Sequence, residues 1–246
     1  MDRVLGFRPS RDGFRFGNSW PHGAPVKLAG LPLGRVRGGL CGGMAYAARE
    51  AWLAGRPVPT DRVPPGGGPL ADQLWRAQLA SLDLPVGPLR YLWFQLPPGE
   101  RRRRRLTLTK GLPRLGASLA TGRPALLGLV RAVSWDPRLL VEHHVVLGYG
   151  LRDTAAGAEV HIYDPNHPGD DSVRLLVTPD GTVTHTGDGT VAAFTVVGRP
   201  AGRVAGAGSA GGVTRAGSAG GVTRAGSAGG VTRAGSAGGG PPAART

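Results

Sequence analysis

The hydrophobic pattern of this chain changes at Pro124, and that change constrains the fold more than any other feature. Before it, apolar residues at helical spacing predict helices at about 41–54, 70–82 and 112–120. After it, continuous or alternating apolar runs predict strands at 125–133, 145–150, 159–163, 173–177 and 191–197. A helical first half followed by hairpin-linked strands predicts the α+β class, with N-terminal helices packed on a C-terminal antiparallel sheet.

Three segments of the first half are expected to lack helix. Phe14 and Phe16 alternate with charged residues, which suits a short strand, and the apolar run at 89–94 also suits a strand. The segment 97–105, in which two prolines and a glycine precede five arginines at 101–105, predicts an exposed loop.

The C-terminal part of the chain is a nine-residue repeat. The unit Gly-Ser-Ala-Gly-Gly-Val-Thr-Arg-Ala begins at Gly208 and recurs at Gly217 and Gly226. It holds too few large apolar groups for burial to offset chain entropy. We therefore expect one domain at 1–199 and a disordered Gly/Ala/Ser/Arg repeat tail at 200–246.

The net charge of +14 is concentrated in two segments. Five arginines lie at 101–105, and five more lie in 200–246, which has no acidic residue. The net charge is therefore no sign of a basic face on the folded domain. A run of like charges is usually a solvated surface segment. Since no aromatic interleaving accompanies the arginines, no specific nucleic-acid partner is expected. Salt-sensitive binding of nucleic acid by generic charge stays an open hypothesis.

The single cysteine excludes an internal disulfide, so a reducing compartment suits this chain. The N-terminal residues lack the apolar run of a signal peptide. No stretch approaches 18 consecutive apolar residues, so no membrane partner is expected. These features predict a cytoplasmic protein.

The one cysteine, Cys41, lies in a glycine-rich turn directly before a predicted helix. Free N–H groups and the positive end of the dipole at a helix start favour thiolate over thiol. A thiol of low pKa beside uncrowded backbone suits nucleophilic attack on a carbonyl. The alternative interpretation is a small apolar core residue, which is how most free cysteines behave.

A histidine and an aspartate lie at the ends of two later strands. His144 begins one strand and Asp164 ends the next, so an antiparallel pairing brings them together. A cysteine nucleophile needs a base for its proton and a third group that orients the base. Cys41, His144 and Asp164 are therefore the candidate catalytic residues, and Asn166 is the alternative orienting group. A turn-forming role is the structural alternative for Asp164.

Several sequence windows, taken in order, resemble the papain-like cysteine peptidase superfamily. That superfamily orders its residues as Cys at a helix start, then His, then Asp or Asn, and its histidine strand resembles the His-x-Val-x-x-x-Gly pattern at 144–150. The ending at 162–165 looks like the branch of bacterial bacteriocin-leader peptidases, in which Asp replaces Asn. The windows 18–21, 39–44 and 163–166 are similar to a group of actinobacterial hypothetical proteins of papain-like type. The resemblance covers about residues 6–178 and implies a papain-like fold.

The chain departs from the papain-like pattern at the oxyanion position. These enzymes usually carry a glutamine six residues before the nucleophile, where this chain has Arg35. The spacing of 103 residues from Cys41 to His144 is also shorter than the roughly 130–150 of papain-type enzymes. Asn18, in an aromatic-flanked turn, is the candidate substitute donor. Gln73 and Gln95 are lesser candidates.

Metal binding is the other use of this chemistry. Four histidines, Asp164 and Cys41 offer nitrogen, oxygen and sulfur ligands; the histidines are His143, His144, His161 and His167. No HExxH or CxxC spacing occurs, so no metal and no other cofactor is expected. His143 is the lesser choice of base, because adjacent strand residues face opposite sides.

The resemblance implies acyl transfer. The expected function is that of a cysteine peptidase, or a related thiol acyl-transfer hydrolase, that acts on peptide or amide bonds of a peptide or protein substrate through Cys41, His144 and Asp164. Asn18 and Asn166 are the supporting candidates. The alternative is a catalytically weak or inactive binding protein of papain fold.

Overall fold

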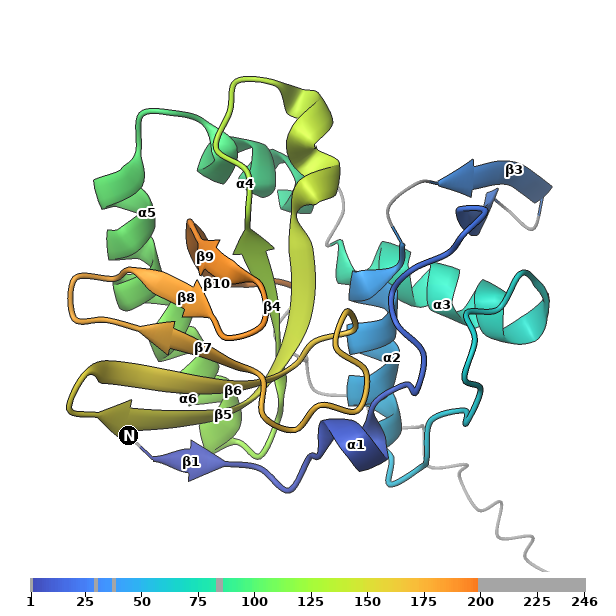
Figure 1. Ribbon diagram of the computed structural model, residues 1–246, viewed down its shortest axis with the longest axis horizontal. Helices are drawn as coiled ribbons and strands as arrows, with labels where there is room; N and C mark the ends of the chain where they lie inside the picture. Colours follow the sequence, from blue (N-terminus) through green and yellow to red (C-terminus); the bar gives the residue numbers. More distant parts are fainter. Residues whose placement is uncertain (1, 29–30, 37–38, 83–85, 199–246) are drawn as a thin grey trace, which may run out of the picture. The chain divides into compact units, whose positions relative to one another are not determined.

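The helices of the first half fall largely where the hydrophobic pattern predicts them (Figure 1). The computed structural model describes residues 2–28, 31–36, 39–82 and 86–198. Its α-helices are α1 (Pro9–Asp12), α2 (Cys41–Leu53), α3 (Gly68–Ser81), α4 (Val86–Gln95), α5 (Glu100–Leu106) and α6 (Leu112–Ala120). A π-helical turn, η1 (Thr107–Gly111), joins α5 to α6. The predictions of α2, α3 and α6 are confirmed within two residues at each end.

Two glycines directly after Cys41 let α2 and α3 pack closely. A Cβ on Gly43 would lie 2.3 Å from the carbonyl oxygen of Leu74, and one on Gly42 would lie 2.3 Å from Oγ of Ser81. The Gly43 N–H donates to Oε1 of Gln78 at 2.7 Å, which satisfies one of the free N–H groups of the helix start. The glycine-rich window around Cys41 therefore serves helix packing.

In the described residues, eight strands form one antiparallel sheet (Figure 1). Its strands are β1 (Arg3–Val4), β4 (Ala125–Val130), β5 (His144–Thr154), β6 (Gly157–Tyr163), β7 (Arg174–Val177), β8 (Val183–His185), β9 (Gly189–Val191) and β10 (Ala193–Val196). Their order is β10-β4-β5-β6-β7-β8-β9, with β1 beside β5. Only Ala192 separates β9 from β10, which stand at opposite ends of that order, so the sheet curls back on itself. The α+β class with an antiparallel sheet is confirmed.

The central strand β5 is covered on both faces. Val145 and Leu147 pack in a core cluster with Met44 and Ala48 of α2. Val146 packs in a second cluster with α6 and with strands β6 to β8. Burial on both faces explains why this strand reads as a continuous apolar run.

Three predictions for the first half are wrong. The run at 89–94 lies in helix α4, and the arginines at 101–105 lie in helix α5. The segment 14–16 is irregular and forms no strand, and both its phenylalanines are buried, with ring centroids 5.4 Å apart. A hairpin of β2 (Ala24–Leu28) and β3 (Leu31–Val36), which the pattern did not indicate, precedes α2.

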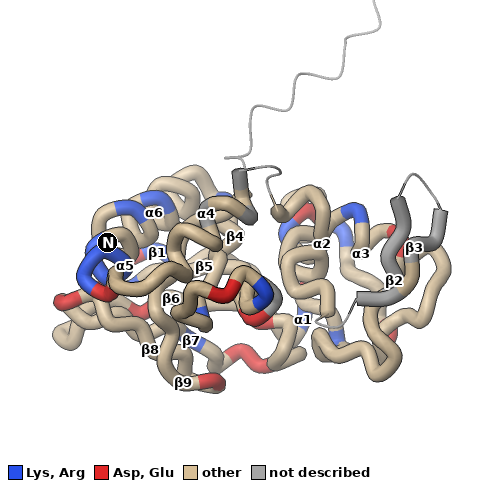
Figure 2. The backbone as a smooth tube through the Cα atoms, turned by 90° about the horizontal axis from the view of Figure 1, so that it is seen from above, with Lys and Arg blue, Asp and Glu red and all other residues tan. Residues whose placement is uncertain are grey.

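The arginine run is partly structural. Arg103 is 5 % exposed, and its Nη1 donates to the carbonyl oxygens of Phe94 and Leu96 at 3.4 and 3.2 Å. Arg102 donates to the carbonyl of Trp93 at 2.8 Å, and its guanidinium lies 4.0 Å from the ring centroid. These groups satisfy carbonyls at the end of α4. Figure 2 shows the basic residues gathered along α5.

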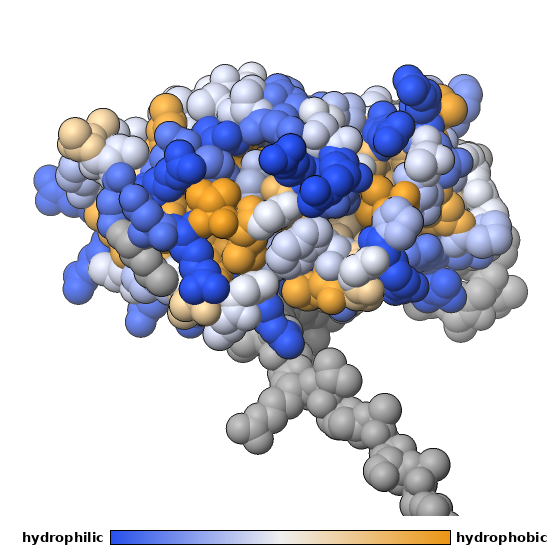
Figure 3. All heavy atoms as spheres, turned by 90° about the horizontal axis from the view of Figure 1, so that it is seen from below, coloured by the Kyte–Doolittle hydropathy of each residue, from blue (hydrophilic) through white to orange (hydrophobic). Residues whose placement is uncertain are grey.

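The surface of the molecule carries both apolar and hydrophilic side chains. On the face seen in Figure 3, apolar side chains form separate patches among hydrophilic ones, as at an ordinary protein surface. The chain divides into Met1–Gly202 and Arg203–Thr246. The tail predicted for 200–246 lies outside the described residues.

Among the described helices, none has both the length and the apolar character needed to cross a membrane.

Candidate active site

Cys41 is the first residue of α2 and is partly buried. The turn before it requires glycine, because Gly39 has φ +69° and a Cβ there would lie 2.3 Å from Oδ1 of Asn18. That Asn18 oxygen accepts the N–H of Leu40 at 2.6 Å. Cys41 therefore begins a helix, and the side chain of Asn18 fixes the turn that precedes it.

His144 and Asp164 meet across two neighbouring strands. The pairing of Leu147 with Tyr163 brings the start of β5 beside the end of β6. His144 Nε2 lies 2.6 Å from Oδ1 of Asp164, and both residues are buried. The other ring nitrogen, Nδ1, is left for Cys41, and His144 lowers the pKa of that thiol. The structure thus brings together the three residues that the sequence indicated.

The electrostatics of the pair favour a thiolate beside an imidazolium. Burial opposes ionisation of Cys41, but the charge and hydrogen bond of His144, with the N–H groups of Val145 and Gly42, lower the pKa of the thiol. Burial also opposes charging of His144, yet the Cys41 thiolate and the Asp164 carboxylate raise its pKa to about 10. The two pKa shifts are not independent, because the thiol of Cys41 and the imidazole of His144 titrate as a coupled pair.

The carboxylate of Asp164 is held by several donors. Although burial raises its pKa, hydrogen bonds from His144, His185 and the Asn166 N–H lower it overall. The Asn166 N–H donates to Oδ1 at 2.7 Å. Asp164, and not the alternative Asn166, therefore contacts His144. The backbone N–H of Asn166 instead donates to the Asp164 carboxylate.

The side chain of Asn166 bonds instead to Asn18. Asn18 Nδ2 donates to Oδ1 of Asn166 at 3.3 Å, and the Asn18 N–H donates to the Pro165 carbonyl at 2.9 Å. Since the Leu40 N–H must meet an oxygen, the orientation of the Asn18 amide is determined. Asn18 therefore joins the nucleophile's helix to the turn after β6, with one amide hydrogen left over.

The two lesser oxyanion candidates lie elsewhere. Gln95 is fully buried, and its Nε2 donates to the carbonyls of Ser134 and Asp136 at 3.2 and 2.5 Å. These bonds occupy both of its amide hydrogens. Gln73 is an exposed residue of α3 that lines a cavity of about 480 Å³ away from the triad, between α2, α3 and the segment 56–59. The side chain of Arg35 lies outside what the structure describes.

His143 has separate surroundings from His144. Its ring stacks on Tyr91, with centroids 5.3 Å apart, and its Nδ1 accepts the Arg131 N–H at 3.3 Å. Burial lowers its pKa to about 4. A neutral, stacked ring of this kind is a packing residue.

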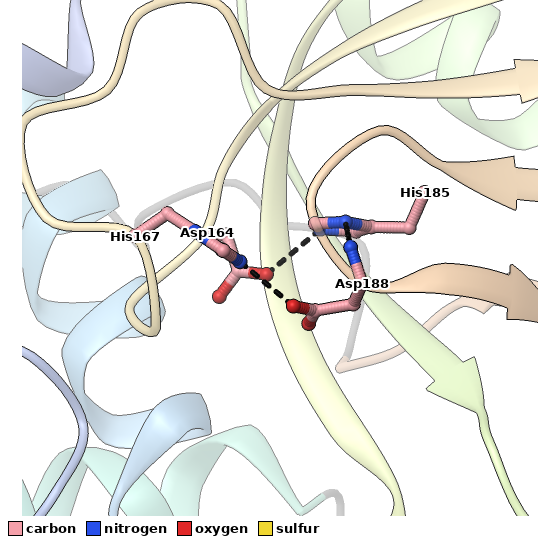
Figure 4. Close-up of side chains that lie close together, drawn as sticks. All are labelled: Asp164, His167, His185 and Asp188. Atoms are coloured by element: carbon pink, nitrogen blue, oxygen red, sulfur yellow. Dashed lines mark hydrogen bonds and ion pairs between the residues drawn. The ribbon is translucent and has the colours of Figure 1, made fainter.

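His185, which ends β8, is a further residue of the site that the sequence did not indicate. Its Nε2 lies 2.9 Å from Oδ2 of Asp164, and it is 1 % exposed. Figure 4 shows it beside a second pair, His167 and Asp188, whose Nε2 and Oδ1 are 2.8 Å apart. No local pattern marks His185, because its contact depends on the order and curl of the sheet.

The four residues of Figure 4 also have the composition of a cation site. One ligand atom from each of Asp164, His167, His185 and Asp188 lies within 4.8 Å of the others. A metal-bound histidine normally donates a hydrogen bond from its other nitrogen. His185 Nδ1 instead accepts the backbone N–H groups of Gly187 and Asp188 at 3.0 and 2.9 Å. A metal on Nε2 would leave that ring without a proton, so the arrangement fits a hydrogen-bond network better than a metal centre.

Comparisons of this chain with family models, curated proteins and solved structures gave no match.

Proposed function

We propose that this chain is a papain-like cysteine peptidase, or a related thiol acyl-transfer hydrolase, acting on peptide or amide bonds. One observation carries the proposal: the thiol of Cys41 interacts electrostatically with the buried His144, whose Nε2 lies 2.6 Å from Oδ1 of Asp164. The helix that carries the thiol packs against β5, whose first residue carries the base.

The reaction begins with attack of the Cys41 thiolate on the carbonyl carbon of the bound peptide or amide. His144, as imidazolium, gives its proton to the leaving amine, and the acyl group remains on sulfur as a thioester. The neutral imidazole then removes a proton from water, which attacks the thioester and releases the acid and the thiol. Asp164 holds the ring so that the nitrogen facing the thiol is the one that gives the proton to the amine and takes the proton from water.

The tetrahedral oxyanion needs donors at the start of α2. The N–H of Cys41, at the first helical position, has no partner within the helix. The remaining amide hydrogen of Asn18 is the proposed second donor, in place of the glutamine for which this chain has Arg35. Losing one such donor costs on the order of 3 kcal/mol of transition-state stabilisation.

The proposed substrate is a peptide or protein, and no cofactor takes part in the steps above. A reducing compartment protects a lone thiol from oxidation, and on that ground we propose a cytoplasmic setting for the reaction. The second candidate, a catalytically weak or inactive binding protein of papain fold, is favoured by Arg35 at the glutamine position.

Alkylation of Cys41 tests the proposal. We expect iodoacetamide to label Cys41 at pH 6–7 faster than a small-molecule thiol. We also expect His144→Ala to slow labelling at least about tenfold. His143→Ala is the matched control and should leave the rate unchanged, since His143 does not contact the thiol. Labelling at the rate of a free thiol in the unmodified protein would contradict the proposal.

Hydrolysis of a mixed peptide library separates the two candidates. Turnover that disappears in Cys41→Ala indicates the hydrolase. Fast labelling of Cys41 without any peptide turnover indicates the inactive binding protein.

A further inference from the structure

We infer that His185 is a positioning residue that acts through Asp164 as a neutral hydrogen-bond donor. The inference rests on the proposed function, since it adds a fourth residue, His185, to the proposed group of Cys41, His144 and Asp164.

The protonation of His185 follows from its partners. The N–H groups of Gly187 and Asp188 both point at Nδ1, at 3.0 and 2.9 Å. A backbone N–H can only donate, so Nδ1 carries a lone pair and no proton. The single ring proton of a neutral imidazole is then on Nε2, where it is donated to Oδ2 of Asp164.

This donor fixes the orientation of the Asp164 carboxylate. Oδ1 receives His144 Nε2 and the Asn166 N–H, while Oδ2 receives His185. With both oxygens bonded, the carboxylate cannot turn away from His144. If Oδ2 lost its donor, a buried carboxylate oxygen would be left unpaired, and the carboxylate would be free to rotate or to take up a proton.

The neutral form of His185 suits this task. A cationic His185 would share the charge of Asp164 and weaken its hold on the His144 imidazolium. The groups that face His185 are Asp164, the His167 ring at 5.6 Å between centroids, and Asp188, whose carboxylate pairs with His167 and Arg131. The two N–H groups at Nδ1 exclude a proton there, so the ring orients the carboxylate without adding charge.

Two amide substitutions that differ by one methylene test this role. In His185→Asn the side-chain oxygen can still accept the two backbone N–H groups, but the amide is too short to reach Asp164. In His185→Gln the amide can extend to Oδ2 and donate. His161→Gln is the matched control, because His161 is another buried histidine of the sheet, with its Nε2 3.1 Å from Oε1 of Glu159 and with no contact to Asp164.

The measurement is the rate of Cys41 alkylation by iodoacetamide as a function of pH. In His185→Asn we expect the midpoint of the profile to move up by about one pH unit, with about tenfold slower alkylation below it, because the thiolate–imidazolium pair is weakened. His185→Gln should keep most of the original profile, and His161→Gln should keep all of it.

The results separate the inference from the proposed function. An unchanged profile in His185→Asn, or an equal shift in His185→Asn and His185→Gln, would overturn the role of His185 as donor. If Cys41 of the unmodified protein titrates like an ordinary cysteine, the proposed function fails, and the role of His185 fails with it.

Discussion

The amide oxygen of Asn18 accepts the backbone N–H of Leu40 at 2.6 Å, one residue before Cys41. The same side chain donates to Asn166, in the turn that carries Asp164. One amide thus links the helix of the nucleophile to the carboxylate end of the triad, although 22 residues on one side and 148 on the other separate the partners. Its two functional groups have separable roles.

Asn18→Ala and Asn18→Asp separate those roles. Asn18→Ala leaves the Leu40 N–H without its acceptor, and we expect a loss of about 1–3 kcal/mol in the free energy of unfolding by urea denaturation. Asn18→Asp keeps an acceptor oxygen but has no N–H to donate. It loses the exposed bond to Asn166 but keeps the acceptor for Leu40, so it should be destabilised less than Asn18→Ala yet lose about 10²–10³-fold in peptide turnover. Alkylation at a pH where the thiol is fully ionised should not change, since alkylation forms no oxyanion. Equal turnover in Asn18→Asp would remove Asn18 from the oxyanion site.

The opposite pKa shifts of Cys41 and His144 predict a distinctive pH dependence. The lowered pKa of the thiol means that alkylation should reach its plateau below the pH at which an ordinary cysteine ionises. Peptide turnover also needs protonated His144, so it should fall as the pH rises through about 10. In Asp164→Asn the imidazolium loses its carboxylate partner, which lowers the pKa of His144 and moves the alkylation midpoint upward. A profile that is identical in Asp164→Asn would show that the carboxylate does not act on the pair.

Gly43→Ala tests the packing of α2 on α3. Its Cβ would lie 2.3 Å from a backbone oxygen of Leu74, which cannot swing away as a flexible side chain can. We expect a loss of about 1–3 kcal/mol in the free energy of unfolding. Gly66→Ala is the control, because a Cβ there meets nothing within 4 Å. Equal stability of the two variants in thermal unfolding would mean that α3 shifts freely.

Two neighbouring arginines should respond differently to the same substitution. Arg103→Met keeps the buried stem but removes the donor to the carbonyls of Phe94 and Leu96, and we expect a cost of about 1–3 kcal/mol. Arg105 is exposed, so Arg105→Met should change the free energy of unfolding by less than about 0.5 kcal/mol. Urea denaturation measures both. If Arg103→Met proved as neutral as Arg105→Met, α4 would not depend on this cap.

Sequence reasoning succeeded where local pattern decides structure and failed where packing decides it. The run at 89–94 is apolar enough for a strand or a helix, and only its place beside β4 and η2 (Pro137–Glu142) makes it part of α4. The arginine run looked like a solvated loop because no sequence pattern shows that Arg102 and Arg103 turn back to the carbonyls of α4.

By itself the sequence determined the α2 helix start at Cys41, the apolar β5 strand that begins at His144 and the α+β order of elements. These follow from periodicity and from residue types that act over a few positions. Only the tertiary structure decided which oxygen each donor meets. The Leu40 N–H meets Oδ1 of Asn18, His144 and His185 meet the two oxygens of Asp164, and Gln95 meets the carbonyls of a remote loop. The reason is physical, because a hydrogen bond depends on a few tenths of an ångström between groups up to 148 residues apart, and the register and curl of the sheet set those distances.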